Sequence, residues 1–205
     1  MRRKSFDALA SAGGVLLTVV LVVAGIALFW GYSYANSSVS SQLAAQKIVF
    51  PAKASLTPAE APYLSKYAGE LMTTGAQAQA YANHYIAVHL SEITGGQTYA
   101  QVSAAAMALT PGTAAYNAAQ SKVQLVFQGT TLRGMLLNAY GWWQMGQIAL
   151  LSSIAAFVAA VLAAILSVLG VWHFRRVPLD EEIPRLPVAQ PVPVARTAER
   201  VPANA

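Results

Sequence analysis

The chain has 205 residues, of which 56% are hydrophobic and only 10% are charged. So few charged residues leave too little polar surface for a soluble globular protein of this length. The sequence contains no cysteine, which excludes disulfides and thiol chemistry. The net charge of +5 is spread along the chain rather than gathered into a basic stripe, which argues against a nucleic-acid partner.

Two apolar stretches, residues 12–34 and 145–172, contain no Asp, Glu, Lys or Arg. Each is longer than the roughly 20 residues that a helix needs to cross about 30 Å of hydrocarbon. A segment in lipid must also bond its own backbone groups, so each stretch is expected to be helical. We predict an all-α membrane protein with two transmembrane helices. The alternative for residues 12–34 is a cleaved secretory signal, because a basic start precedes the stretch and small residues follow its core.

Basic residues lie outside both stretches, at Arg2 and Arg3 before the first and at Arg175 and Arg176 after the second. By the positive-inside rule, residues 1–11 and 173–205 are cytoplasmic and the protein spans the plasma membrane twice. Aromatic side chains near the ends of the stretches are expected to lie at the two membrane interfaces. The predicted interfacial residues are Trp30, Tyr32, Tyr34, Trp142, Trp143, Trp172, Arg175 and Arg176.

The intervening residues 35–144 are predicted to form an extracytoplasmic domain of short helices, because Pro and Gly interrupt the segment repeatedly. Thr57 with Glu60, and Thr98 with Gln101, have the spacing of capping boxes at helix starts. Gly95 after a regular pattern marks a helix end. The expected helices cover about 37–49, 75–93, 98–109 and 113–127, with a last one from about 131 into the second apolar stretch.

The C-terminal tail after Arg176 holds six of the ten prolines. Proline interleaved with Val, Ala and Arg is typical of extended, disordered chain, so we predict a disordered Pro-rich tail. Pro184 and Pro187 have the PxxP spacing of a docking segment, which is an alternative to a merely solvated tail.

His84, His89 and Glu92 are the candidate metal ligands of the outer domain, because imidazole and carboxylate are common ligands. His84 and His89 are five residues apart, a rotation of about 140° on a helix, so they do not share one face. The sequence lacks the common hydrolase, nucleotide-binding and zinc-protease motifs. We therefore expect no metal, no cofactor and no enzymatic activity, with a metal-dependent enzyme as an alternative.

Small residues repeat every four positions in the second stretch and would let another helix approach closely. They are Ser152, Ala156, Ala160 and Ala164. The simplest partner for this face is the first stretch near Gly25, and a second copy of the chain is the alternative. Neither stretch contains an ionisable residue, which argues against proton relays and voltage sensing.

Four segments, RRKSFDALASAGG, QLAAQKIVFP, YANHYIAVHL and TLRGMLLNAYGWWQMGQIA, resemble a family of uncharacterised actinobacterial membrane proteins with two spans. Members often carry the label aromatic ring-opening dioxygenase. That label implies a non-haem iron enzyme, and the chain has no iron-ligand set to match it. The resemblance implies membrane placement and supplies no catalytic residues.

The sequence thus favours a non-enzymatic accessory or structural protein of the cell envelope. Its outer domain would bind a partner protein, lipid or wall component, with the bilayer and possible homo-oligomers as further partners. The order of span, helical domain and span is also that of sensors and receptors, which is the main alternative. Such a sensor would need a separate output partner, because the tail is too short and Pro-rich for a signalling domain. A pore formed by several copies is a further alternative.

Overall fold

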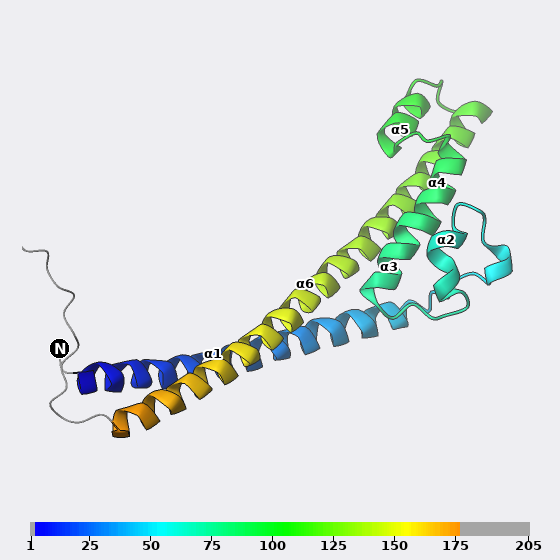
Figure 1. Ribbon diagram of the computed structural model, residues 1–205. Helices are drawn as coiled ribbons and strands as arrows, with labels where there is room; N and C mark the ends of the chain where they lie inside the picture. The colour runs from blue at the N-terminus through cyan, green and yellow to red at the C-terminus, as the bar shows by residue number, and fades with distance from the viewer. Residues whose placement is uncertain (1–2, 177–205) are drawn as a thin grey trace, which may run out of the picture. The chain divides into compact units, whose positions relative to one another are not determined.

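The computed structural model describes residues 3–176. Over that range the chain is helical, with one isolated β-bridge between Val49 and Leu71. The described residues confirm the predicted all-α class, while the Pro-rich tail from residue 177 lies outside them. The helices, coloured along the chain in Figure 1, are α1 (Arg3–Ala45), α2 (Ala61–Leu64), α3 (Gly75–Tyr81), α4 (Ala87–Thr94), α5 (Tyr99–Met107) and α6 (Ala114–Arg176), with the single turns η1 (Lys53–Ser55), η2 (Ser65–Tyr67) and η3 (Ala82–Ile86).

Helices α1 and α6 are both long and apolar enough to cross a membrane, as predicted. At about 1.5 Å per residue, the 43 residues of α1 extend roughly 65 Å and the 63 residues of α6 roughly 95 Å. Hydrocarbon about 30 Å thick accounts for less than half of either length. Both helices therefore continue without a break beyond the ends of their apolar stretches.

The predicted division of 113–144 into two helices is wrong, because α6 runs unbroken through Gly129. Glycine inside a helix costs only about 1 kcal/mol relative to alanine, which is too little to stop a long helix. This glycine also has a packing role, since a Cβ built on it would lie 2.6 Å from Cδ2 of Leu90. The missing side chain lets α4 approach α6.

The predicted starts of the short helices are largely confirmed. Thr98 and Gln101 form a complete capping box at α5, and Oγ1 of Thr113 accepts from the backbone N–H of Tyr116 at the start of α6. At Thr57 only half of the box is present: its N–H donates to Oε2 of Glu60 over 2.9 Å, while its hydroxyl has no partner. The capping box of Thr74 and Gln77 at α3 was not predicted from the sequence.

The predicted helix over 75–93 is confirmed in extent, but its middle is not α-helical. Residues Ala82–Ile86 form the π-helical turn η3, closed by an N–H of Ala87 that reaches back to the carbonyl of Ala82. The helix then ends at Gly95, which has a φ of 65°. That left-handed conformation suits glycine, as the sequence indicated.

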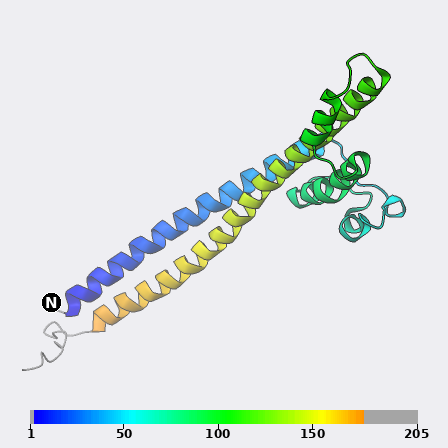
Figure 2. The ribbon, with the colours of Figure 1, turned by 90° about the horizontal axis from the view of Figure 1, so that it is seen from above.

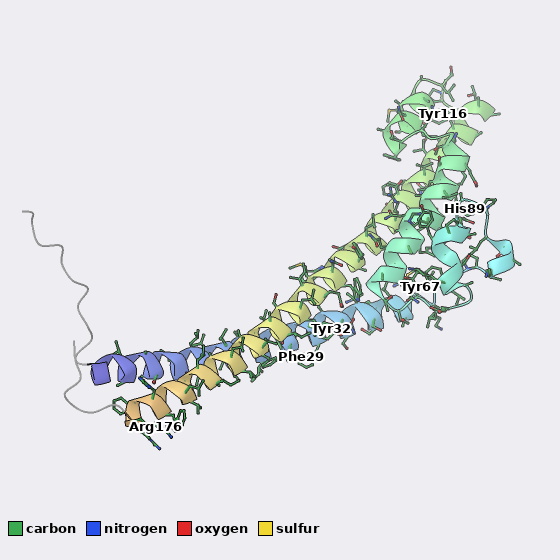
Figure 3. The ribbon with its side chains drawn as sticks, viewed as in Figure 1. Phe29, Tyr32, Tyr67, His89, Tyr116 and Arg176 are labelled. Carbon is green, nitrogen blue, oxygen red and sulfur yellow. The ribbon has the colours of Figure 1, made fainter. Side chains whose placement is uncertain are left out.

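Contacts divide the chain into two units, of which the larger is Leu17–Leu162. Its hydrophobic core joins the C-terminal end of α1, the α2–η3 segment and the middle of α6. Figure 2 shows these elements as a ribbon, and Figure 3 shows them with side chains. The buried core residues are Val39, Leu43, Phe50, Leu64, Met72, Ala78, Ala82, Ile86 and Leu136. Gly75 is needed beside this core, because a Cβ on it would collide with the side chain of Trp143.

The smaller unit contains the described residues before Leu17 and after Leu162. Its helices also meet through small residues. A Cβ on Gly170 would lie 2.6 Å from Oγ of Ser11, and a Cβ on Gly14 would collide with Oγ of Ser167. At its C-terminal end the guanidinium of Arg176 lies 3.9 Å from the ring centre of Trp172, a cation–π contact.

Candidate functional site

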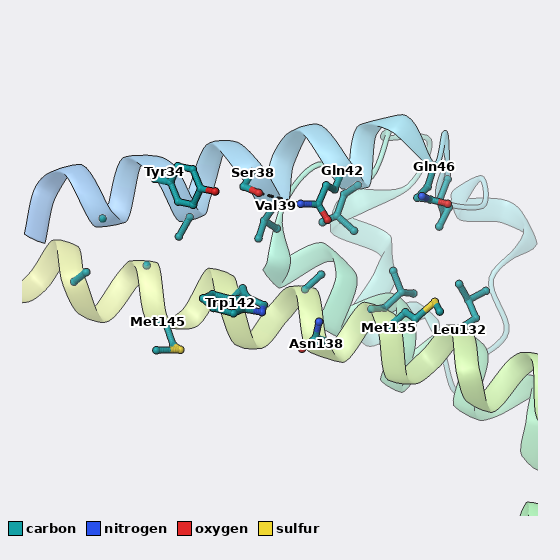
Figure 4. Close-up of a pocket in the computed structure, with 18 residues that line it drawn as sticks. Tyr34, Ser38, Val39, Gln42, Gln46, Leu132, Met135, Asn138, Trp142 and Met145 are labelled. Carbon is teal, nitrogen blue, oxygen red and sulfur yellow. Dashed lines mark hydrogen bonds between the residues drawn. The ribbon is translucent and has the colours of Figure 1, made fainter.

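An elongated groove lies between α1 and α6 within the larger unit (Figure 4). Its volume is about 720 Å³. Along α1 it follows one helical stripe from Gly31 to Gln46, a rise of roughly 22 Å. The facing stretch of α6 runs antiparallel from Leu132 to Ala149. We call this feature the α1/α6 groove.

The floor of the α1/α6 groove is the domain core itself. Val39, Leu43 and Leu136 line the groove and also belong to the buried core cluster. On its open side, Leu132, Met135 and Trp142 are exposed, with 66% of Met135 accessible. The groove is thus an apolar channel with a rigid floor and an unpartnered rim.

The two ends of the α1/α6 groove differ in polarity. At one end small residues bring the helices together, because a Cβ on Gly146 would lie 3.3 Å from that of Ala35. Toward the other end the side-chain amides of Gln42, Gln46 and Asn138 join the lining, and Nε2 of Gln42 donates to Oγ of Ser38 over 2.9 Å. None of the lining residues is charged. A ligand here would be held by apolar contact and neutral hydrogen bonds.

A second feature of the larger unit is a row of five aromatic rings, Tyr67, Phe50, Tyr81, Tyr85 and His89, which we call the aromatic row. Neighbouring ring centres are 5.2, 5.3, 4.6 and 4.4 Å apart in that order. The last three follow one another at intervals of four residues, and Tyr85 lies within the turn η3. Aromatic pairs at such distances stabilise a core beyond simple burial.

The aromatic row ends at a buried carboxylate. Glu60 is 1% exposed, and its Oε1 lies 3.3 Å from Nδ1 of His89. The same Nδ1 lies 2.9 Å from the carbonyl of Tyr85. A buried carboxylate needs a charged or hydrogen-bonding partner, and His89 supplies one when protonated. Burial, followed by Tyr85 and Glu60, raises the pKa of Tyr81 from 10.0 to about 12.

The structure does not bring the three predicted metal ligands together. His84 stacks on Tyr63 with ring centres 3.6 Å apart, whereas His89 turns to Glu60. Glu92 is exposed on α4. Among the described side chains, those of residues 8–176, no three His, Cys, Asp or Glu are close enough to hold a metal ion.

Most predicted interfacial aromatics are accessible in the described structure. Trp30 is highly exposed and stacks on Tyr34, and Trp142 is exposed on the rim of the α1/α6 groove. Trp143 is different, because it packs against the core and over Gly75. Tyr32 is half-buried, while Trp172, Arg175 and Arg176 are exposed at the end of α6.

The face of α6 that meets α1 is close to the predicted ladder of small residues but rotated from it. Ala160 is buried, Ala156 and Ala164 are half-buried, and Ser152 is exposed. Ser153 takes the contact instead, donating from Oγ to the carbonyl of Gly25 over 2.8 Å. A ladder with a spacing of four drifts across the face of a 3.6-residue helix, which explains the difference.

Neither the α1/α6 groove nor the Glu60–His89 pair was predicted from the sequence. The groove has a sequence signal, a stripe of small and polar residues at helical spacing continuing from Gly31 to Gln46. The pair joins residues 29 positions apart and has no such signal. The chain matches no protein-family model, and no curated protein or solved structure is detectably similar to it.

Proposed function

We propose that this chain is a two-pass plasma-membrane protein with both termini in the cytoplasm. Its residues 35–144 form a helical binding domain on the outer face, and it acts as a non-enzymatic accessory protein of the cell envelope. The observation that carries this proposal is the shared core of the larger unit. Val39 and Leu43 of α1 and Leu136 of α6 pack into one cluster with Phe50 and Met72 of the intervening segment.

The shared core supports a domain held at a fixed distance from the membrane. Its α1 residues follow the aromatic pair of Trp30 and Tyr34 within about three helical turns, and no flexible linker intervenes. Aromatic residues of this kind prefer the membrane interface. A domain built on two continuous helices would present its surface to a ligand or partner at the outer leaflet.

A sensor is the second candidate, and the continuity of α6 favours it. This helix runs unbroken from Ala114 to Arg176, so one continuous helix connects the proposed outer domain to the basic end. A sensor of this design would pass a change in the outer domain to a separate cytoplasmic partner.

Single-cysteine labelling tests the proposed topology, since the chain has no cysteine of its own. Ala105→Cys on α5 should react with a membrane-impermeant maleimide in intact cells, because this residue is exposed. Ala189→Cys, in the C-terminal segment, should react only after the membrane is opened. The topology would be overturned if both variants were labelled in intact cells, or if Ala105→Cys were not labelled there.

Native mass spectrometry of the gently extracted protein tests the accessory role. A stoichiometric partner that crosslinks to residues 35–144 would support it, whereas turnover of a substrate by the isolated chain would overturn it. A partner that crosslinks only through the cytoplasmic end would favour the sensor.

A further inference from the structure

We propose that the α1/α6 groove holds an acyl chain of a glycerophospholipid that is lifted part-way out of the outer leaflet. The glycerol backbone would lie at the amide end, near Gln42 and Asn138, and the chain would run down toward Gly31 and Gly146. This inference rests on the proposed membrane placement and names the ligand class of the outer domain.

The position of the groove points to a ligand from the bilayer. One end lies at Gly31 and Tyr34, where the apolar stretch of α1 finishes, and the lining continues to Gln46. The last 12 residues of that path extend roughly 18 Å beyond Tyr34. The groove is therefore a continuous apolar path from the predicted interface into the outer domain.

Exposed apolar side chains along this path need an occupant if they lie outside the hydrocarbon. Met135 and Leu132 are exposed on the groove rim, about ten or more residues along α6 from Met145 at the interfacial end. Contiguous apolar surface in water is unfavourable and marks a binding site in soluble regions of proteins. A hydrocarbon chain would cover it without requiring any charged contact.

The dimensions favour a thin, extended ligand over a helix. A volume of about 720 Å³ spread over roughly 22 Å corresponds to a mean cross-section on the order of 30 Å². An α-helix with side chains is about 10–12 Å across, which is far wider than such a channel. A volume in the range of roughly 300–1,000 Å³ is typical of small-ligand sites.

The polar lining matches the other end of a lipid. The amides of Gln42, Gln46 and Asn138 can donate to ester carbonyls and accept from glycerol hydroxyls. No lining residue carries a charge, so the site would select the chain and the ester region rather than an ionic headgroup. Binding should therefore be similar for anionic and zwitterionic lipids.

Photocrosslinking with a diazirine analogue of methionine tests the proposal, because the chain has only five methionines. The full chain is placed in vesicles of dioleoyl phosphatidylglycerol and phosphatidylethanolamine, irradiated and mapped by peptide mass spectrometry. Lipid adducts are expected at Met145 and at Met135. Met107 on α5 is 75% exposed and serves as the internal control, where no lipid adduct is expected.

Two groove-filling variants sharpen the test. Ala139→Phe and Ser38→Phe each place a ring in the groove from a different helix, and both should abolish the adduct at Met135 while leaving that at Met145. The matched control Ala118→Phe adds the same ring on an exposed position of α6 and should change neither adduct. Retained helical circular dichroism and the Met145 adduct confirm that the variants fold.

Two results would overturn the proposal. Lipid adducts at Met145 without any at Met135 would show that lipid does not enter the groove. A peptide crosslink at Met135, from this chain or another protein, would show that a helix occupies the groove. The adduct pattern does not depend on which side is outside, so a failure of the cysteine topology test remains distinguishable.

Discussion

Within Leu17–Leu162, the same two helices meet in two different ways. Around Gly25 and Ser153 they form a closed seam, where a hydroxyl bonds directly to a backbone carbonyl and a Cβ on Gly25 would lie 2.8 Å from the Phe157 ring. Around Gln42 and Met135 the pair leaves the α1/α6 groove. Side-chain size thus decides whether two long helices close against each other or leave a groove between them.

The difference follows from which faces carry the bulky residues. In the closed seam, Gly25 contacts Ser153 and the Phe157 ring, while other large residues such as Leu162 and Val158 are exposed. In the groove, Val39 and Leu136 turn toward the domain core and leave the rim unfilled. The closed seam should therefore depend on close packing, and the groove on the core behind it.

The largest expected effect comes from removing the core behind the groove. Phe50 is 2% exposed and contacts Tyr67 and Tyr81 in the aromatic row. Phe50→Ala should lower the free energy of unfolding of the domain built around this core by about 3–5 kcal/mol, because it creates a cavity. Near-UV circular dichroism during thermal unfolding measures the loss. Val49→Ala, at an exposed neighbour, is the control. An equal loss in the free energy of unfolding for Phe50→Ala and Val49→Ala would contradict the role of the core.

The closed seam should respond to added volume. Ser153 is 1% exposed, so Ser153→Leu must push the helices apart and loses a hydrogen bond. We expect a loss of about 1–3 kcal/mol in the free energy of unfolding, the usual cost of overpacking. Unfolding in mixed micelles gives the value. Ser152→Leu adds the same side chain at the exposed neighbour and should be nearly neutral. A larger loss in the free energy of unfolding for Ser152→Leu than for Ser153→Leu would place the helix contact on the predicted ladder of small residues.

Much of the fold could be predicted from the sequence because its signals are local. Apolar length predicts α1 and α6, and Thr98 with Gln101 predicts the start of α5. The unbroken course of α6 was missed because Gly129 has the form of a break but is needed for contact with Leu90. That contact depends on tertiary packing, which no local pattern reveals.

The candidate site was harder to predict, because its parts come from distant segments. The α1/α6 groove requires Gly31–Gln46 to face Leu132–Ala149, about one hundred residues later in the chain. The contact between His89 and Glu60 likewise joins two segments that are 29 residues apart in the chain. Sequence patterns identify faces, but not which faces meet.

A smaller effect is expected at the Glu60–His89 pair. His89→Ala leaves the buried Glu60 carboxylate with only the N–H of Thr57, so the free energy of unfolding should fall by about 1 kcal/mol. The imidazole side chain is 45% exposed, and this screening keeps the effect below that of a fully buried pair. In a Glu60→Gln background, His89→Ala should cost less. A double-mutant cycle by chemical unfolding measures this coupling, and strictly additive losses would refute it.

The smallest effect at neutral pH, but a distinctive one at alkaline pH, is expected at Tyr81. Its pKa is raised to about 12 in the folded protein, so folding favours the protonated phenol. The resulting stabilisation is fully present below the unfolded pKa of 10.0 and is lost as pH rises from there to about 12. Tyr81→Phe removes this ionisation, so the variant should lose less stability than the parent across that interval. Unfolding at a series of pH values tests this prediction. Absorbance titration of the tyrosines gives a direct readout, because the titrating component of highest pKa should vanish in the variant.

Identical slopes of the free energy of unfolding against alkaline pH for parent and variant would mean that Tyr81 ionises freely. The aromatic row would then be open to water rather than packed against Phe50.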